Sequence, residues 1–577
     1  MFCFDYRFFY KFLQKGSKNK KKRGVITYEK RWMVSLMAVA MAVSMAACGK
    51  SSGGGTENAG SSAPAGTTAA EAGASGETQA ADAGEPVDGG VLTISLSSSP
   101  KNLDPVKYTG TYESQIIGSV CDTLVEYNSS LTEIMPSIAA SWEVSDDGKE
   151  YTFKLRDDVY FQPGQYQDGR QVTAEDIKYS LERSHELSAM NRLDMLDHCE
   201  VISDTEVKCV LENPNAVFLT ALTDAGNVIV PKEEVEGWGD DFGTHLVGSG
   251  PFALKEFKLD QQATLVRNEK YWAQKPHLDG VVFRPVSDGN QAVNALRTGE
   301  VNVATSLTGE AVQVARDDDT VKLLEMPGLH VSYLYFNMVN GPTKDPKVRE
   351  ALIKAVNVEE LTGGVYQYGE AVPASLPLPP GSWGYDEAVK AEVPTYDPEA
   401  AKALLAEAGY PDGFDLNLYI SNTPTRVKMA TLFQAYLQQN LNVNVNINTS
   451  EWGTFSEIGA SGQADVFGMS WTWYPDPYFF LNKLFYSGEI GSLGNGQGYN
   501  NPEVDKCLEN ALLTTDQNER ADLYKKALAL IVKDMPGIFY ANENVEWGVT
   551  PNVQGLVQRA DGKVKICTTD INVWLSK

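Results

Sequence analysis

Residues 136–161 read PSIAASWEVSDDGKEYTFKLRDDVYF, and residues 168–184 read DGRQVTAEDIKYSLERS. Within the first stretch, YTFKLRDDVYF alternates apolar and polar side chains, which is typical of a strand with one buried face. In the second stretch, Thr173 precedes two acidic residues and an apolar spacing of helical period, so Thr173 is predicted to cap a helix. Together the two stretches predict a chain in which strands and helices are interleaved.

The same interleaving continues on both sides of this region. VLTISL at 91–96 and ADVFGMS at 464–470 are predicted strands. Asp345 with Pro346, and Asp397 with Pro398, are predicted to begin two helices, the second of which ends at Gly409. The 489 residues from Gly89 to Lys577 are too many for one hydrophobic core, and no internal repeat divides them. The predicted fold class is α/β with mixed sheets.

The quoted region resembles the hallmark segment of the family 5 extracellular solute-binding proteins, the oligopeptide-, dipeptide- and nickel-binding group. Later segments extend the resemblance in the family's order, from about Gly89 to the C-terminus: VGSGPFALKEF, RNEKYWAQKPHLDGVVFRPV, MPGLHVSYLYFNM, DPKVREALIKAVN, LLAEAGYPDGF, WTWYPDP and YNNPEVD. Within the group, EMPGLHVSYLYFN and PLPPGSWGYDE are most similar to the dipeptide-binding proteins.

The resemblance implies a two-lobed clamshell of the periplasmic-binding-protein kind, with a deep cleft between the lobes. On this reading lobe one comprises residues 89–335 and the returning tail 546–577, and lobe two is inserted as residues 336–545. Strands near 329–338 and 538–547 would cross between the lobes. Ligands of such proteins are expected in the cleft at the domain interface.

The N-terminal residues do not belong to this fold. Residues 1–48 are predicted to be an N-terminal extension and a lipoprotein signal peptide, because Met33–Ala47 is an uncharged apolar run of 15 residues after Lys30-Arg31. The end of the run resembles a bacterial lipobox, which implies lipidation of Cys48; a cysteine placed there by chance is the alternative. Residues 49–88 are rich in Gly, Ser, Ala and Thr and are predicted to be a flexible tether.

Charge and cysteine content argue against a nucleic-acid-binding protein and against a zinc site. Residues 1–48 hold 10 Lys and Arg against 2 Asp and Glu, so residues 49–577 carry 39 against 74. So acidic a surface, with no basic stripe, excludes nucleic acid as a partner. The cysteines beyond Cys48 form no CxxC pair, so no zinc site is expected. Cys199 and Cys209 flank a predicted hairpin, where a disulfide and two buried thiols both remain open.

The candidate ligand-binding residues are mostly aromatic. In WTWYPDP, residues 471–477, Trp471, Trp473 and Tyr474 would line a cleft wall; a hydrophobic plug beneath a loop is the alternative. Trp383 could line the cleft in the same way, or could be packed in the core. Arg426 could clamp a ligand carboxylate, or could be a solvated arginine that opens a helix. Tyr112, in a predicted loop after the first strand, is a further candidate.

One departure from the family concerns the ligand's ammonium group. Peptide-binding members generally carry an Asp three positions before the DP pair of this motif, and that carboxylate holds the peptide α-ammonium. The corresponding residue here is Trp473, and Asp476 is the nearest acid that could substitute. A ring at this position could instead face an apolar ligand or a cation.

The resemblance implies a monomeric, lipid-anchored protein on the extracytoplasmic face of the cell membrane. It would capture small peptides by lobe closure and deliver them to ABC permease subunits, without a cofactor, a metal or catalytic residues. Nickel, a metal chelate or another small solute is the alternative ligand. An extracellular hydrolase is the remote alternative, against which the chain has no GxSxG, HExxH or P-loop motif.

Overall fold

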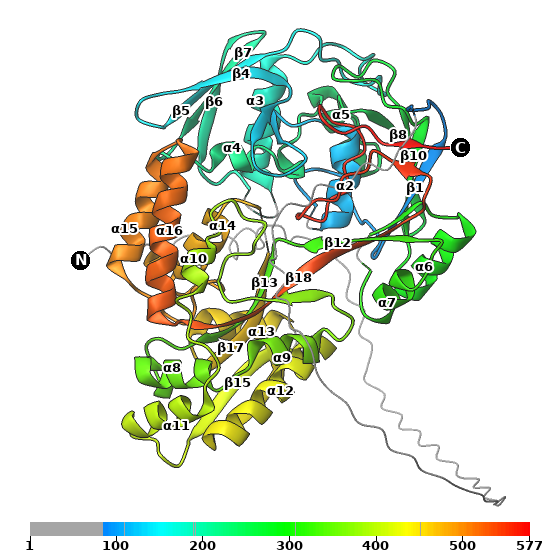
Figure 1. Ribbon diagram of the computed structural model, residues 1–577. Coiled ribbons are helices and arrows are strands. Elements are labelled where there is room, and N and C mark those ends of the chain that lie inside the picture. The colour runs from blue at the N-terminus through cyan, green and yellow to red at the C-terminus, as the bar shows by residue number, and fades with distance from the viewer. Residues whose placement is uncertain are drawn as a thin grey trace, which may run out of the picture. The chain divides into compact units, whose positions relative to one another are not determined.

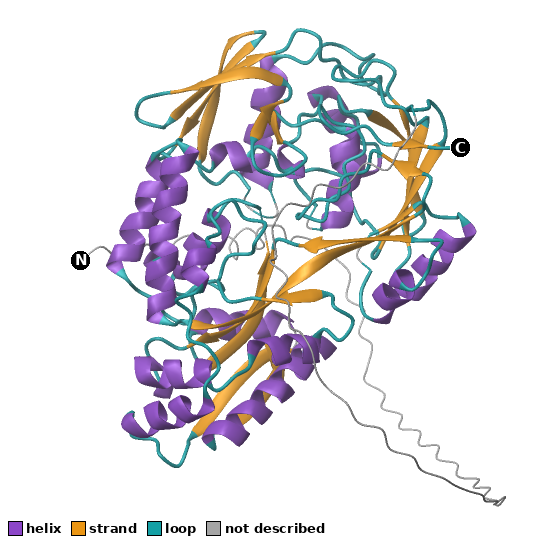
Figure 2. Ribbon diagram, viewed as in Figure 1, coloured by secondary structure: helices purple, strands orange, loops and turns teal. Residues whose placement is uncertain are grey.

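The computed structural model describes residues 85–577 except 109, 189, 191, 306, 451 and 473. The predicted signal peptide, Cys48 and nearly all of the predicted tether therefore lie outside the described residues. Mixed sheets and helices make up the described part, as Figure 2 shows. No helix within it is long and apolar enough to cross a membrane.

The first group of strands surrounds the predicted strand VLTISL, which is β1. β1 pairs in parallel with β10 and β11, and β10 continues antiparallel into β9 and then β8. Helix α2 packs on this group in a core that includes Ile94, Ile116 and Phe283. The bounds are β1 (Val91–Leu96), α2 (Thr111–Val120), β8 (Phe252–Lys258), β9 (Gln262–Arg267), β10 (Gly280–Pro285), α6 (Gly289–Thr298), β11 (Val303–Ala304), α7 (Glu310–Arg316) and β12 (Lys322–Pro327).

The second group of strands contains the predicted strand ADVFGMS, which is β17. β17 lies between β15, to which it is parallel, and β13, to which it is antiparallel. Helices α8, α9, α11 and α12 contribute to its core. The bounds are β13 (His330–Phe336), α8 (Pro346–Lys354), α9 (Val358–Val365), β14 (Ala371–Pro373), α10 (Glu387–Lys390), α11 (Pro398–Glu407), β15 (Asp415–Ser421), α12 (Pro424–Leu441), β16 (Asn444–Ser450), α13 (Trp452–Ser461), β17 (Val466–Thr472), α14 (Tyr478–Phe485), α15 (Pro502–Leu513) and α16 (Gln517–Asp534).

One long strand, β18 (Gly537–Val549), joins the two groups (Figure 1). Its residues 537–541 pair with β13, and its residues 544–549 pair with β12. The strand thus runs from one group into the other, and β13 follows β12 after two residues. These are the two segments that the sequence predicts to cross between lobes.

The opening sequence stretch forms a third, smaller sheet with helix α3. Four antiparallel strands run in the order β4-β5-β7-β6, and the predicted half-buried alternation is present in β5. Thr173 begins α3 through a capping box, in which its backbone N–H donates to the Asp176 carboxylate over 2.9 Å. Further bounds are β2 (Val125–Tyr127), β3 (Ile134–Pro136), β4 (Ala139–Val144), β5 (Glu150–Leu155), α3 (Ala174–Leu187), β6 (Leu196–Ser203), β7 (Glu206–Leu211), α4 (Phe218–Ala221), α5 (Lys232–Trp238), β19 (Val553–Gln554) and β20 (Trp574–Leu575).

Local sequence signals account well for the helix ends. The Asp345 side chain accepts a hydrogen bond from the Lys347 backbone at the start of α8, and Asp397 caps α11 in the same way. Gly409 follows α11 with a φ of +93°, a conformation that glycine adopts without strain. These predictions are confirmed. The prediction of a loop around Tyr112 is wrong, because Tyr112 lies in the first turn of α2.

The hairpin cysteines face each other as two buried thiols. Cys199 and Cys209 are direct partners in the β6–β7 register, and their sulfur atoms are 3.3 Å apart without a bond. Of the two possibilities left open by the sequence, the structure has the pair of buried thiols.

Glu546 on β18 is expected to make stability depend on pH. It is buried and lies opposite Glu325 of β12. Burial, followed by repulsion from Glu325, raises the pKa of Glu546 from 4.5 to about 8. The folded protein therefore holds a proton there that the unfolded chain loses, so the free energy of unfolding falls as pH rises from about 4.5 to 8.

Glu546→Gln is expected to flatten this dependence, because an amide carries no titrating proton. Urea denaturation at several pH values between 5 and 8 measures the slope, and Glu256→Gln on the exposed part of β8 is the control. An unchanged slope in Glu546→Gln would contradict the pKa assignment.

Candidate functional site

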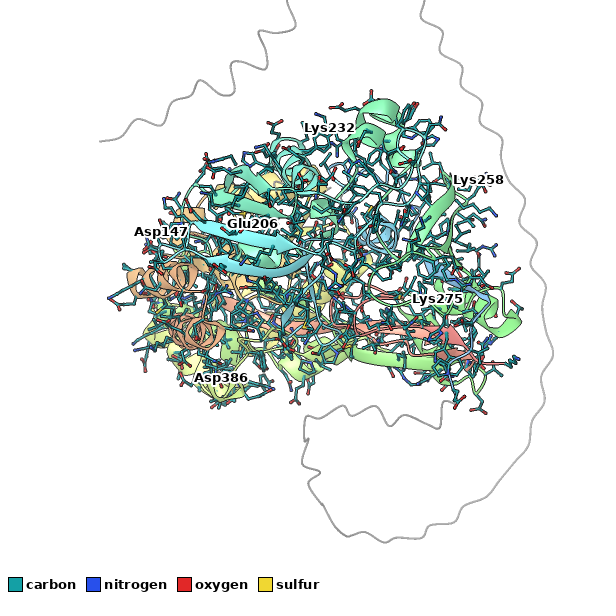
Figure 3. The ribbon with its side chains drawn as sticks, turned by 90° about the horizontal axis from the view of Figure 1, so that it is seen from above. Asp147, Glu206, Lys232, Lys258, Lys275 and Asp386 are labelled. Carbon is teal, nitrogen blue, oxygen red and sulfur yellow. The ribbon has the colours of Figure 1, made fainter. Side chains whose placement is uncertain are left out.

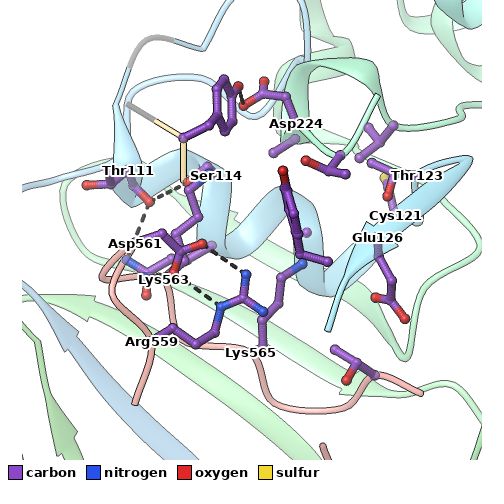
Figure 4. A pocket seen from close by; sticks show the side chains of 18 of the residues that line it. Thr111, Ser114, Cys121, Thr123, Glu126, Asp224, Arg559, Asp561, Lys563 and Lys565 are labelled. Atoms are coloured by element: carbon purple, nitrogen blue, oxygen red, sulfur yellow. Dashed lines mark hydrogen bonds and ion pairs between the residues drawn. The ribbon is translucent and has the colours of Figure 1, made fainter. Parts of the chain in front are cut away.

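A cavity of about 370 Å³ lies between segments that are distant in sequence. Its walls come from α2 and the residues on either side of it, from residues 121–137, from segments around 190–192 and 223–228, and from Tyr271. The end of β17 with the following residues, and the C-terminal residues 559–568, complete the lining; Figure 4 shows part of it. Its volume is at the small end of the range of about 300–1,000 Å³ that is usual for small-molecule sites. The walls combine tyrosines with eight charged side chains: Asp122, Glu126, Arg192, Asp224, Arg559, Asp561, Lys563 and Lys565.

Asp224 is the most heavily bonded acid in the wall. Its carboxylate accepts hydrogen bonds from the hydroxyl groups of Tyr108, at 2.6 Å, and Tyr474, and it pairs with Arg192 at 2.6 Å. The Arg192 guanidinium also lies over the Tyr108 ring. Burial alone would raise the pKa of Asp224, but Lys563, Arg192 and the two tyrosine hydroxyls outweigh it and hold that pKa below its usual value. Asp224 is therefore an ionised anchor that ties Tyr474 to the opposite wall.

Asp122 is a second buried acid of the wall, and its hydrogen-bond donors are all neutral. It accepts hydrogen bonds from Ser249 Oγ at 2.9 Å and from Trp272 Nε1 at 3.0 Å, with the Tyr271 hydroxyl at 3.4 Å. Burial raises the pKa of Asp122 to about 6, although the hydrogen bonds from Trp272 and Ser249 oppose this. Its charge thus disappears below about pH 6.

The C-terminal segment supplies the basic side of the cavity (Figure 4). Arg559 is paired with Asp561, with nitrogen to oxygen distances of 3.0 and 3.2 Å. The Lys563 ammonium lies 5.6 Å from the centre of the Tyr474 ring. Burial, together with the charges of Arg559 and Lys563, lowers the pKa of Lys565, while Glu126 opposes this.

Of the predicted ligand-binding residues, Tyr474 is the one that lines this cavity. Trp471 is turned toward α14, where its indole Nε1 donates to the Phe479 carbonyl over 2.7 Å. Trp473 lies outside the described residues.

Asp476 and Trp383 belong to a buried cluster around α16. Both Asp476 oxygens are bound by Arg520, at 2.8 and 3.1 Å, and one also accepts the Tyr478 backbone N–H. The Arg520 guanidinium in turn lies over the Trp383 ring. Neither Asp476 nor Trp383 is a lining residue of the cavity. Their contacts here are internal ones, and the ligand roles suggested by the sequence stay predictions.

Arg426 and Tyr112 also lie away from the cavity wall. Arg426, in the first turn of α12, donates to the Tyr540 hydroxyl over 2.9 Å and to Ser470 Oγ. It is thus tied to side chains of β17 and β18, and its predicted role as a carboxylate clamp stays untested. The Tyr112 ring packs on the core beside α2.

The charged residues that line the cavity are not among the ligand-binding residues predicted from the sequence. Lys563 and Lys565, close to Arg559, form a local group of basic residues in an otherwise acidic chain, and this is a signal that the sequence carries. Arg192, Asp224 and Tyr108 carry no local signal, because only tertiary contacts bring them together. Within the described part of the chain, no group of three or more His, Cys, Asp or Glu side chains could hold a metal ion.

Comparison with known proteins identifies the family. Residues 133–492 match the family described as bacterial extracellular solute-binding proteins, family 5 Middle. The dipeptide-binding protein of Escherichia coli (strain K12) is 30% identical over 506 residues, covering 83% of this chain and 94% of the relative. Heme-binding protein A of Haemophilus influenzae is 33% identical over 471 residues, covering 77% of this chain and 85% of that protein.

A solved structure shows the same fold. The ABC transporter-associated periplasmic binding protein DppA from Helicobacter pylori, in complex with the peptide STSA, superimposes with a TM-score of 0.68 at 29% identity. The match covers 85% of this chain and 99% of that one. It confirms the predicted two-lobed α/β fold with mixed sheets. The chain therefore belongs to family 5 of the bacterial extracellular solute-binding proteins.

Proposed function

We propose that this protein captures small peptides outside the cell and delivers them to an ABC importer, as a binding protein without catalytic activity. The observation that carries the proposal is the cavity of about 370 Å³, which has polar and aromatic walls, in a chain of this family. Peptides are supported as ligands because the E. coli relative is a dipeptide-binding protein and the H. pylori structure holds a peptide.

Lobe closure is the proposed mechanism. We assign residues 89–335 and 546–577 to lobe one and residues 336–545 to lobe two. With these boundaries, Tyr108 and Asp224 belong to one lobe and Tyr474 to the other, so the cavity has walls from both. A ligand that touches both lobes favours the closed arrangement by its differential affinity. The permease subunits would then recognise the closed, loaded monomer.

Calorimetry and thermal unfolding of residues 89–577 with a panel of dipeptides and tripeptides test the function. A peptide at 100 times its dissociation constant is expected to add about 2.7 kcal/mol to the free energy of unfolding. Haem and a nickel chelate serve as comparison ligands. Binding of either, with no response to any peptide, would overturn the peptide assignment while leaving a solute-binding role.

We further propose that Cys48 anchors the protein to the extracytoplasmic face of the cell membrane through a lipid. Fatty-acid labelling of cells is expected to tag the wild type and to leave Cys48→Ser untagged, because the thiol of the lipobox is then absent. Cys3→Ser is the matched control and should be tagged as the wild type is. An untagged wild type would contradict the lipid anchor.

A further inference from the structure

The acids that line the cavity are already engaged by other groups of the protein. Asp224 accepts hydrogen bonds from Tyr108, Tyr474 and the Gly226 backbone and is paired with Arg192. The remaining three acids also accept hydrogen bonds. Asp561 accepts one from Arg559, Glu126 accepts one from the Thr569 hydroxyl, and Asp122 accepts two, from Ser249 and Trp272.

The cations divide into two kinds. Arg192 and Arg559 are each paired with one of these acids. Lys563 and Lys565 are different, because neither side-chain ammonium donates a hydrogen bond to, or forms an ion pair with, any described residue. The Lys565 ammonium lies against α2, 3.4 Å from the point where a Cβ on Gly118 would stand. The lack of a side chain on Gly118 therefore leaves room for the ammonium.

The two lysines lie on either side of Val564, and all three residues line the same cavity. Each ammonium has three N–H donors that no described residue accepts. Acids lie near both, Asp224 near Lys563 and Glu126 near Lys565, but those carboxylates already accept hydrogen bonds from other groups. Burial and the neighbouring cations lower the pKa of Lys565, although Glu126 opposes this. A carboxylate between the two would supply both acceptors and the opposite charge.

We propose that Lys563 and Lys565 form an anion subsite that binds a carboxylate of the ligand. The inference rests on the proposed function and narrows it: the carboxylate end of a small peptide is recognised here. The C-terminal carboxylate and an acidic side chain share this chemistry, and the choice of test peptides separates them.

The test uses Ala-Phe with each end free or blocked, measured by calorimetry. Amidation of the C-terminus is expected to weaken binding at least about tenfold, because a charge-assisted hydrogen bond is lost. Acetylation of the N-terminus is expected to have a smaller effect. If an acidic side chain occupies the subsite instead, Ala-Glu amide will bind like Ala-Phe acid, whereas Ala-Phe amide will not.

Lys563→Gln and Lys565→Gln are each expected to lower the affinity for the free acid toward that for the amide, with a clearly smaller loss for the amide. Lys258→Gln, an exposed lysine on β8 with 51% of its side chain accessible (Figure 3), removes the same charge outside the cavity and is the control. Equal binding of acid and amide by the wild type overturns the subsite, as does an equal loss for both forms in the variants.

A different set of results is expected if the protein does not bind peptides at all. If the wild type binds none of these peptides, the peptide assignment is contradicted, and succinate then tests the subsite by itself. A thermal shift with succinate that disappears in the double variant Lys563→Gln, Lys565→Gln supports the subsite. No shift in the wild type overturns it.

Discussion

Asp476→Ala is expected to lower the free energy of unfolding by about 3–5 kcal/mol, the usual cost of breaking a buried ion pair. The carboxylate is 1% exposed and the Arg520 side chain 8%, and the two are joined by two nitrogen to oxygen contacts. Arg520 is further held by the Ala511 carbonyl and lies against the Trp383 and Tyr524 rings. Removal of the carboxylate would leave a guanidinium that cannot reach water without disrupting this packing.

Urea denaturation of the ligand-free protein measures the loss. Glu407→Ala is the control, because its ion pair with Lys347 is exposed and is expected to contribute less than about 1 kcal/mol. Adding Arg520→Met to Asp476→Ala is expected to recover much of the stability, since no buried charge is then unpaired. An Asp476→Ala protein of wild-type stability that fails to bind peptides would instead support the ligand role suggested by the sequence.

Tyr474→Phe is expected to weaken peptide binding by about 10- to 100-fold, the equivalent of one hydrogen bond to a charged group. The Tyr474 hydroxyl donates to Asp224 on the opposite wall of the cavity. With the proposed lobe boundaries this bond forms when the lobes close, so its loss disfavours the closed state that holds the ligand. Asp224 keeps Tyr108, Arg192 and the Gly226 backbone, so no buried charge is left without a partner.

Calorimetry with one peptide measures the affinity, and small-angle scattering measures closure. Tyr478→Phe is the matched control, since Tyr478 is a neighbouring aromatic residue that does not line the cavity. It is expected to bind as the wild type does. If Tyr474→Phe closes and binds normally, the bond to Asp224 does not hold the lobes together.

The sequence was sufficient for the local elements of the fold. Helix starts at Asp345 and Asp397 depend on a side chain that bonds to the backbone two or three residues later. The alternation in VLTISL, and the hairpin around residues 200–208, depend on neighbours along one or two strands. Such signals act over a few residues, so they can be read without knowledge of the tertiary structure.

Only the tertiary structure decided which side chains share the cavity. Tyr474, Trp471 and Asp476 lie within six residues, yet only Tyr474 faces the cavity. The indole of Trp471 instead finds an acceptor on α14, and Asp476 finds Arg520, 44 residues further along the chain. Asp224 and Lys563 meet at one site from positions more than 300 residues apart. A buried polar group goes where its hydrogen bonds and counter-charges can be satisfied, and those partners are set by packing between distant segments.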